Sequence, residues 1–310
     1  MLPIVCAGCG ELLDRDSPIC RFCGEDNRIS ETPIDVVEVP ADVDLDRLNP
    51  WSQIKHEIIE NYASAYTRIL RTQRWAQRYV YIDAFAGAGV ALDSEADVLT
   101  EAGALRALNV EPPFSEYHFI ELDAGKAGIL HQLARRRPSA QVHVGDYRDV
   151  LPHLLTRCRF EDFARGLCLL DPYGLSVDYA LLTQIAAMKT VEIFFNFMLV
   201  SANRNVLWRA AHSVSPRRAA MMTRAWGDES WREAAYDRQP NLFGAETQFK
   251  ASNDRVIAAY RERLRDAGFA YVPEPVAMRN SVNAPIYYLF FCSPKAVAAD
   301  IVDQIFRRYR

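Results

Sequence analysis

The stretch Val80–Gly89, which reads VYIDAFAGAG, decides the fold of this chain. Its first half is apolar and rich in β-forming residues, and its second half consists of small residues. It therefore predicts a buried strand that leaves a sheet through a tight turn. Asp83 stands where the strand ends. An acid there, followed by glycines that let the backbone approach a ligand, is how open α/β sheets build a pocket for a nucleotide.

The sequence after this turn alternates between strand and helix patterns. We expect a loop at 90–100, strands at 117–123, 141–146, 166–170 and 191–197, and helices at 51–78, 101–109, 124–136, 150–157 and 179–188. This alternation predicts a Rossmann-like α/β fold, a doubly wound parallel sheet with helices on both faces. Beyond a helix at 253–267, two strand patterns at 271–278 and 285–292 predict an antiparallel pair that closes the sheet, and a helix from Ser293 ends the chain.

The first 30 residues carry two pairs of cysteines separated by ten residues, namely Cys6 with Cys9 and Cys20 with Cys23. Paired spacing of this kind brings four thiolates around one Zn²⁺, and a closed site of four sulfurs is structural. We therefore predict a zinc ribbon at 1–30, which metal binding would fold. Residues 31–50 are acidic and contain three prolines, so they predict an extended linker to a main domain at 51–310.

Composition limits the class of protein. Of 310 residues, 50% are hydrophobic and 25% are charged, as in ordinary globular proteins. No apolar run approaches the roughly 20 residues that span a bilayer, and the N-terminus lacks the pattern of a signal peptide. We expect a cytoplasmic protein without membrane contact. Its net charge of −4 leaves any binding of nucleic acid to local basic patches.

Four strand ends in succession carry acids, and the carboxyl ends of parallel strands meet at one edge of a sheet. These acids are Asp83, Glu121, Asp146 and Asp171. We expect Glu121 to accept hydrogen bonds from ribose hydroxyls, and Asp146 to accept one from the exocyclic amine of adenine. The acids therefore predict a site for an adenosine-containing ligand.

The glycine turn indicates which ligand this is. It has no third glycine and does not open at once onto a helix that would hold a pyrophosphate. Glu121 also follows Asp83 by 38 positions, more than the ~20 residues of the dinucleotide fingerprint. A cofactor without phosphates fits better. We predict S-adenosylmethionine, with Phe85, Gly87 and Gly89 beside it and Asp83 on its methionine amino group.

The run Asp171-Pro172-Tyr173-Gly174 resembles the catalytic loop of amino-methyltransferases, (Asp/Asn)-Pro-Pro-(aromatic). The resemblance implies that Asp171 and a carbonyl of the prolyl segment accept hydrogen bonds from an amine, and that Tyr173 stacks on a flipped base. Asp171, Pro172 and Tyr173 are thus the predicted catalytic residues. The second proline is missing here, which affects the geometry around the amine. The alternative is that Asp171 only turns the chain after its strand.

Five segments together resemble the three-Cys-motif partner protein family. They are IKHEI (54–58), YIDAFAGAG (81–89), FIELD (119–123), LDPYGL (170–175) and EIFFNF (192–197). The resemblance covers about residues 51–300 and implies a class I methyltransferase-like domain in a bacterial protein, with a second protein as partner. The closing antiparallel strand pair is a feature of class I methyltransferases. The four-cysteine ribbon is an addition to the core of that family.

Two segments leave alternatives open. The helix pattern at 51–78 carries Lys55, His56 and Asn61, of which one could face the cofactor, although a solvated or interdomain role is favoured. Its apolar stripe is expected at Ile54, Ile58, Tyr62, Ala65 and Ile69. The predicted helical insertion at about 199–250 is rich in arginine and tryptophan. It either binds a phosphate backbone and stacks bases, or caps the domain with its tryptophans inside and its arginines balanced by acids.

The leading hypothesis is an S-adenosylmethionine-dependent methyltransferase that acts on an amine of nucleic acid. The alternative is a non-catalytic, methyltransferase-like adaptor that binds a partner protein or nucleic acid through the ribbon and the insertion. A nuclease is disfavoured, because the sequence shows no cluster of carboxylates and lysine with nuclease spacing.

Overall fold

The structure is a computed structural model that describes residues 37–208, 214–240 and 246–310. The predicted zinc ribbon at 1–30, with Cys6, Cys9, Cys20 and Cys23, lies outside these ranges. Within them, no group of three or more His, Cys, Asp or Glu side chains is placed to hold a metal ion. No helix of the described ranges is long and apolar enough to cross a membrane.

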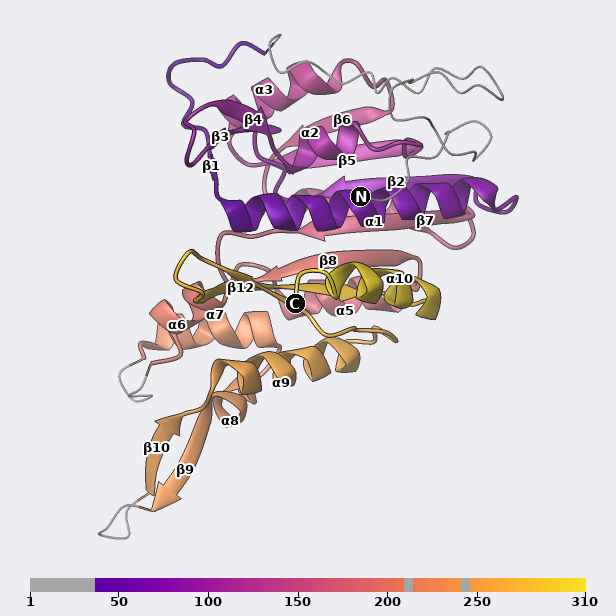
Figure 1. Ribbon diagram of the computed structural model, residues 1–310. Helices are drawn as coiled ribbons and strands as arrows, with labels where there is room; N and C mark the ends of the chain where they lie inside the picture. The colour runs from indigo at the N-terminus through magenta and orange to yellow at the C-terminus, as the bar shows by residue number, and fades with distance from the viewer. Residues whose placement is uncertain (1–36, 209–213, 241–245) are drawn as a thin grey trace.

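A seven-stranded sheet forms the centre of the described chain, in the order β11-β12-β8-β7-β2-β5-β6 (Figure 1). The strands from β8 to β6 are parallel, and β12 and β11 add two antiparallel pairings. This confirms the predicted, mostly parallel sheet with its closing antiparallel pair. The strands are β2 (Arg78–Asp83), β5 (Glu116–Glu121), β6 (Ala140–Val144), β7 (Ala164–Leu170), β8 (Val191–Phe197), β11 (Val276–Arg279) and β12 (Pro285–Cys292).

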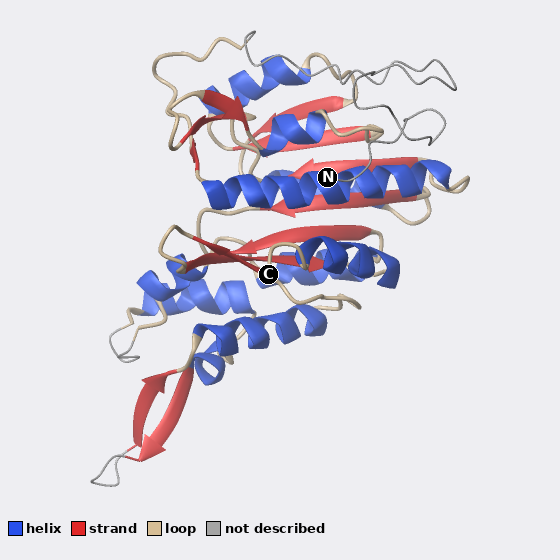
Figure 2. Ribbon diagram, in the orientation of Figure 1, coloured by secondary structure: helices blue, strands red, loops and turns tan. Residues whose placement is uncertain are grey.

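Helices cover both faces of the sheet (Figure 2). Successive strand residues point to opposite faces, so Tyr81 packs with α1, α2, α3 and α10, whereas Val80 packs with α4, α5 and α9. Because both faces are buried, the strands read as apolar runs in the sequence. The helices are α1 (Pro50–Thr72), α2 (Gly103–Leu108), α3 (Ala124–Ala134), α4 (Tyr147–Leu155), α5 (Tyr179–Met188), α6 (Leu199–Asn205), α7 (Pro216–Trp226), α8 (Trp231–Ala235), α9 (Asn253–Asp266) and α10 (Ala296–Phe306).

The segment before α1 packs against the main domain. There, β1 (Arg47–Leu48) pairs with β3 (Val90–Asp93), which pairs with β4 (Leu99–Glu101). The predicted loop at 90–100 therefore contains part of a small sheet. Leu45 and Leu48, which the sequence analysis placed in the linker, are buried in the core. Strands of two to four residues are too short to show a period of two, which is why the sequence pattern missed them.

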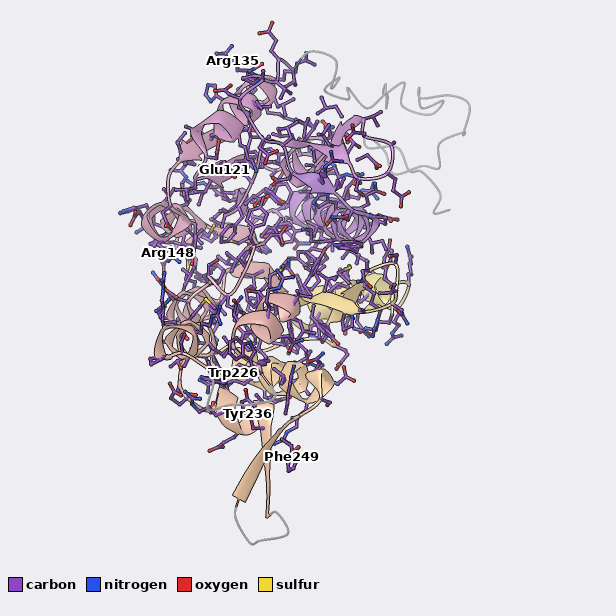
Figure 3. All side chains as sticks on the ribbon, turned by 90° about the vertical axis from the view of Figure 1, so that its left-hand side faces the viewer. Glu121, Arg135, Arg148, Trp226, Tyr236 and Phe249 are labelled. Atoms are coloured by element: carbon purple, nitrogen blue, oxygen red, sulfur yellow. The ribbon has the colours of Figure 1, made fainter. Side chains whose placement is uncertain are left out.

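The segment at 199–250 differs from the predicted helical insertion. It holds α6, α7 and α8, but also a hairpin of β9 (Tyr236–Pro240) and β10 (Glu246–Lys250) that extends away from the sheet (Figure 1). Trp226 and Trp231 are fully buried, and the Arg232 guanidinium pairs with Glu229 at 2.5 Å. Trp226 lies in the body of the protein and Phe249 out on the hairpin (Figure 3). For these two tryptophans the capping interpretation holds.

Candidate active site

The carboxyl ends of the parallel strands lie at the edge of the sheet that faces the viewer in Figure 3, where Glu121 and Arg148 are labelled. Two adjoining cavities open at this edge. The inner cavity, of 280 Å³, is lined by Lys55, Asp83 and Asp171, and the outer cavity, of 610 Å³, is lined by Glu121 and Asp146. Phe85 and Tyr173 line both cavities. The four predicted strand-end acids thus line two adjoining cavities, two acids in each.

Glu121 and Asp146, two of the three acids that line the outer cavity, are held by backbone N–H groups. Glu121 accepts hydrogen bonds from the N–H groups of Gly87 and Asp123, each at 2.8 Å, and so ties the glycine turn to the end of β5. Asp146 caps α4, because it accepts from the Arg148 N–H at 2.8 Å, and it also pairs with the Arg148 guanidinium at 2.9 Å. These bonds fix both carboxylates at the cavity wall.

The two glycines of the turn have different roles. Both adopt left-handed backbone angles that favour glycine, with φ of +64° at Gly87 and +77° at Gly89. Gly87 lines the inner cavity, whereas Gly89 lines neither cavity. A Cβ at Gly89 would come within 2.9 Å of methyl groups of Leu130 and Leu133 on α3. The structure therefore brings Gly87 to the cavity and Gly89 to the packing of α3.

Asp171 is bonded at both carboxylate oxygens. The Lys55 ammonium pairs with Oδ2, and the Asn196 amide donates to Oδ1 at 2.6 Å. Burial alone would raise the pKa of Asp171, but Lys55 and Asn196 outweigh it and hold that pKa below its ordinary value. Burial alone would likewise lower the pKa of Lys55, and the Asp171 carboxylate outweighs it and raises that pKa. The two groups therefore form a buried ion pair at neutral pH.

Three other polar groups at the inner cavity are buried without such compensation. Burial raises the pKa of Asp83 to about 7, although Oδ1 of this residue accepts from the Phe85 N–H at 3.0 Å. Burial and the neighbouring Lys55 ammonium lower the pKa of His56 to about 3, so its imidazole is neutral. Nδ1 of His56 and Oδ1 of Asn196 have no hydrogen-bond partner within the described chain. Buried polar atoms are normally satisfied, so these atoms are candidate contacts for a ligand.

The loop after β7 forms the boundary between the cavities. Pro172 lines the inner cavity, and Tyr173, which is 76% exposed, lies between the two. Burial and the neighbouring Asp46 carboxylate raise the pKa of Tyr173, and Asp46 also pairs with Lys126 at 2.9 Å. The segment before α1 thus reaches across the mouth of the site, which the predicted linker gave no reason to expect.

Sequence reasoning did not assign Lys55, His56 and Asn196 to the site. On α1 the favoured role for Lys55 and His56 was solvated or interdomain, yet both are buried, whereas Ile54 and Ile69 of the predicted stripe are exposed. Two polar residues on the buried face had shifted the apparent stripe. A signal for Asn196 did exist, because it is a single amide inside the apolar strand pattern EIFFNF.

Comparisons with known proteins address the fold. No protein-family model and no curated protein matches the chain, so the resemblance to the three-Cys-motif partner family stays a prediction. The chain is similar to a protein from Legionella pneumophila, with 10% identity, a TM-score of 0.50, and coverage of 84% of this chain and 93% of that chain. It is also similar to Trm1 from Pyrococcus horikoshii, which was solved with S-adenosyl-L-methionine. The identity is 10% and the TM-score 0.47, and the match covers 87% of this chain and 61% of that chain. At such identity the first likeness concerns the fold alone. The seven-stranded, mostly parallel sheet with helices on both faces has a Rossmann-like α/β architecture.

Proposed function

We propose that this chain is an S-adenosylmethionine-dependent methyltransferase that acts on an amine of nucleic acid. The observation that carries the proposal is the pair of adjoining cavities at the carboxyl edge, of 280 and 610 Å³, which share Phe85 and Tyr173 as lining residues. A cofactor with an amino-acid part and an adenosine part suits two such compartments. Ligands in open α/β sheets bind at this edge.

The residues present fit this cofactor, which supplies an electrophilic methyl group when it is bound. Asp83 would face the ammonium of its methionine part, since a cation favours the ionised form of a buried acid. Glu121 and Asp146 would accept from ribose hydroxyls and from the adenine amine, because carboxylate oxygens can accept more than one hydrogen bond. Leu122, which lines the outer cavity and is 70% exposed, offers an apolar surface to the adenine ring.

The Lys55–Asp171 pair decides how the acceptor would be held. Lys55 and Asn196 stabilise the ionised carboxylate of Asp171, so this residue is poorly suited to remove a proton as a base. An amine does not need such a base, because its lone pair can attack once the N–H groups are oriented by acceptors. Oδ1 of Asn196 is an unpartnered acceptor within the described chain, next to Asp171. We therefore assign orientation of the amine to Asp171 and Asn196, and positioning of Asp171 to Lys55.

Basic groups beside the mouth support nucleic acid as the substrate. The loop after β7 lies against α6, since a Cβ at Gly174 would be 3.3 Å from the Ser201 hydroxyl. Arg204 on α6 is exposed, as are Arg217 and Arg218 at the start of α7. None of these three forms an ion pair with a described carboxylate, which leaves them available to phosphates.

Isothermal titration calorimetry of the zinc-loaded chain with S-adenosylmethionine tests the cofactor. We expect one site, with affinity lost in Asp83→Ala and kept in the control Asp300→Ala, which changes an exposed acid on α10. Absence of binding to folded wild-type protein would refute the proposal. Transfer of a labelled methyl group to total RNA and to genomic DNA, followed by nucleoside analysis, then tests the substrate.

One observation favours the adaptor as a second candidate, namely that both oxygens of Asp171 are already bonded inside the protein. An adaptor needs no reactive acceptor site. It predicts that Asp171→Ala complements a deletion strain as well as wild type, while Cys20→Ser fails to do so. Loss of complementation in Asp171→Ala, with the cofactor still bound, would reject the adaptor.

A further inference from the structure

A third cavity, of 400 Å³, lies at the opposite end of the sheet from the candidate active site. This is the right-hand end in Figure 1, where β7 and β8 begin. Its walls come from the second half of α1, with Tyr62, Tyr66 and Leu70, and from α10, with Ala298 and Ile301. We name it the basal cavity. Its volume lies within the roughly 300 to 1,000 Å³ of small-molecule sites, and its walls are mainly apolar.

Polar atoms in the walls of the basal cavity lack partners. The Tyr66 hydroxyl and the Thr190 hydroxyl are both buried and accept or donate no hydrogen bond within the described chain. Tyr66 is 6% exposed and Thr190 is 1% exposed. Glu192, which also lines the cavity, is different, because the Tyr62 and Ser293 hydroxyls donate to its two oxygens. Two hydroxyls therefore remain for a ligand, whereas the buried acid is already satisfied.

The rim of the basal cavity is positively charged. Arg165, Lys189 and Lys295 line it, and none of them forms an ion pair with a carboxylate in the part of the chain that the structure describes. The Arg165 guanidinium instead lies over the Trp75 ring, 4.4 Å from its centroid. Arg157, by contrast, pairs with Glu116 at 2.7 Å. The buried Glu192 carboxylate in the cavity wall offsets part of the positive charge of the rim, since Arg165 and Lys295 favour its ionised form. Three cations around one buried acid still leave a net positive rim, which favours an anion.

We propose that the basal cavity binds a small amphipathic anion, whose apolar chain or ring lies between α1 and α10 and whose single carboxylate meets Arg165 and Lys295. The apolar walls supply the binding energy through burial. The charged rim sets the orientation of the ligand, and the free hydroxyls of Tyr66 and Thr190 take up its remaining polar contacts. This site is separate from the proposed methyltransferase site and does not depend on it.

Calorimetry of the full chain with decanoate tests the proposal, and decyltrimethylammonium, a cation with a chain of the same length, is the control ligand. We expect saturable binding of decanoate only. Arg165→Gln should raise Kd about tenfold, as for loss of a charge-assisted contact. Arg308→Gln, which changes an exposed arginine just after α10, should leave Kd unchanged. Val297→Trp should block the rim, and Val282→Trp, a valine at a distant exposed turn, is its matched control.

Three results would overturn the inference: no decanoate binding, equal binding of the cation, or unchanged affinity in Val297→Trp. If S-adenosylmethionine displaces decanoate, and Val297→Trp binds decanoate as tightly as wild type does, then the ligand lies in the candidate active site instead. Binding of decanoate in a variant that no longer binds S-adenosylmethionine, such as Asp83→Ala, would support the basal cavity whatever the outcome for the proposed function.

Discussion

Replacing Lys55 with methionine removes the cation that compensates Asp171 inside the candidate active site. The Lys55 side chain is 8% exposed and that of Asp171 is 21% exposed. Breaking a buried ion pair from one side costs about 3–5 kcal/mol of folding stability, because it leaves a buried charge unpaired. Asn196 still donates at 2.6 Å, and methionine keeps most of the apolar contacts. We therefore expect Lys55→Met to lower the free energy of unfolding by about 2–3 kcal/mol at pH 7.5.

The pH dependence of this loss has a defined sign. In wild type, Lys55 holds the pKa of Asp171 low. The ion pair therefore stabilises the fold above the pKa that aspartate has in the unfolded chain. This stability is lost as the pH falls through the lower pKa of the folded state. In Lys55→Met, burial is opposed mainly by the Asn196 amide, so we expect the pKa of Asp171 to rise. The carboxyl then protonates on mild acidification, and the difference from wild type should shrink between about pH 7.5 and about pH 5.

Urea denaturation at both pH values, monitored by tryptophan fluorescence, measures the loss. Lys126→Met is the matched control, because Lys126 pairs with the more exposed Asp46 and should cost less than about 1 kcal/mol. The double variant Lys55→Met/Asp171→Asn should lose less unfolding free energy than the two single variants lose together, by at least about 1 kcal/mol. A cost below about 1 kcal/mol for Lys55→Met, without pH dependence, would show that the buried pair does not exist in solution.

Further predictions concern the turn, the cofactor and the insertion. Burial raises the pKa of Asp83 to about 7, so the ionised fraction of Asp83 rises roughly eightfold from about pH 6 to about pH 7.5. The Kd for S-adenosylmethionine, measured by calorimetry, should fall by a similar factor. A Kd that does not change with pH would contradict this. Gly89→Ala should lower the melting temperature more than Gly87→Ala. Both changes strain the backbone, but only Gly89→Ala forces a Cβ against leucine methyl groups. Equal shifts in melting temperature would count against the role of Gly89 in packing α3. Trp231→Ala should cost about 3–5 kcal/mol of stability, while binding of nucleic acid by the remaining folded protein, measured by fluorescence anisotropy, stays unchanged.

The sequence predicted the sheet well because its signals are long and repeated. Buried strands on both faces give apolar runs, and the acids at their ends follow from the same pattern. The position of Asp83, Glu121, Asp146 and Asp171 at one edge then follows from parallel topology, whereas the order of the strands came only from the structure. What the pattern at Val80–Gly89 did not reveal is that one glycine serves the cavity and the other the packing of α3.

The site residues that sequence reasoning missed are those whose role depends on a partner far along the chain. Lys55 pairs with Asp171, which lies 116 positions later in the sequence. The residues around Lys55 on α1 give no sign that an acid at the end of β7 will compensate its charge. Asp46 is similar, since its contacts with Lys126 and Tyr173 exist only once the segment before α1 is folded onto the sheet. Periodicity treats such residues as solvated, because a buried charge without its partner would be unfavourable.

The helix α1 contacts both ends of the protein. Lys55 on its second turn reaches the inner cavity, and Tyr66, 11 residues or about 16 Å further along the axis, lines the basal cavity. A helix is stiff along its axis, so an anion that shifts α1 at one end also shifts the Lys55 ammonium relative to Asp171. Thermodynamic linkage then makes the effect reciprocal: whatever factor the basal ligand applies to cofactor affinity, the cofactor applies to the basal ligand.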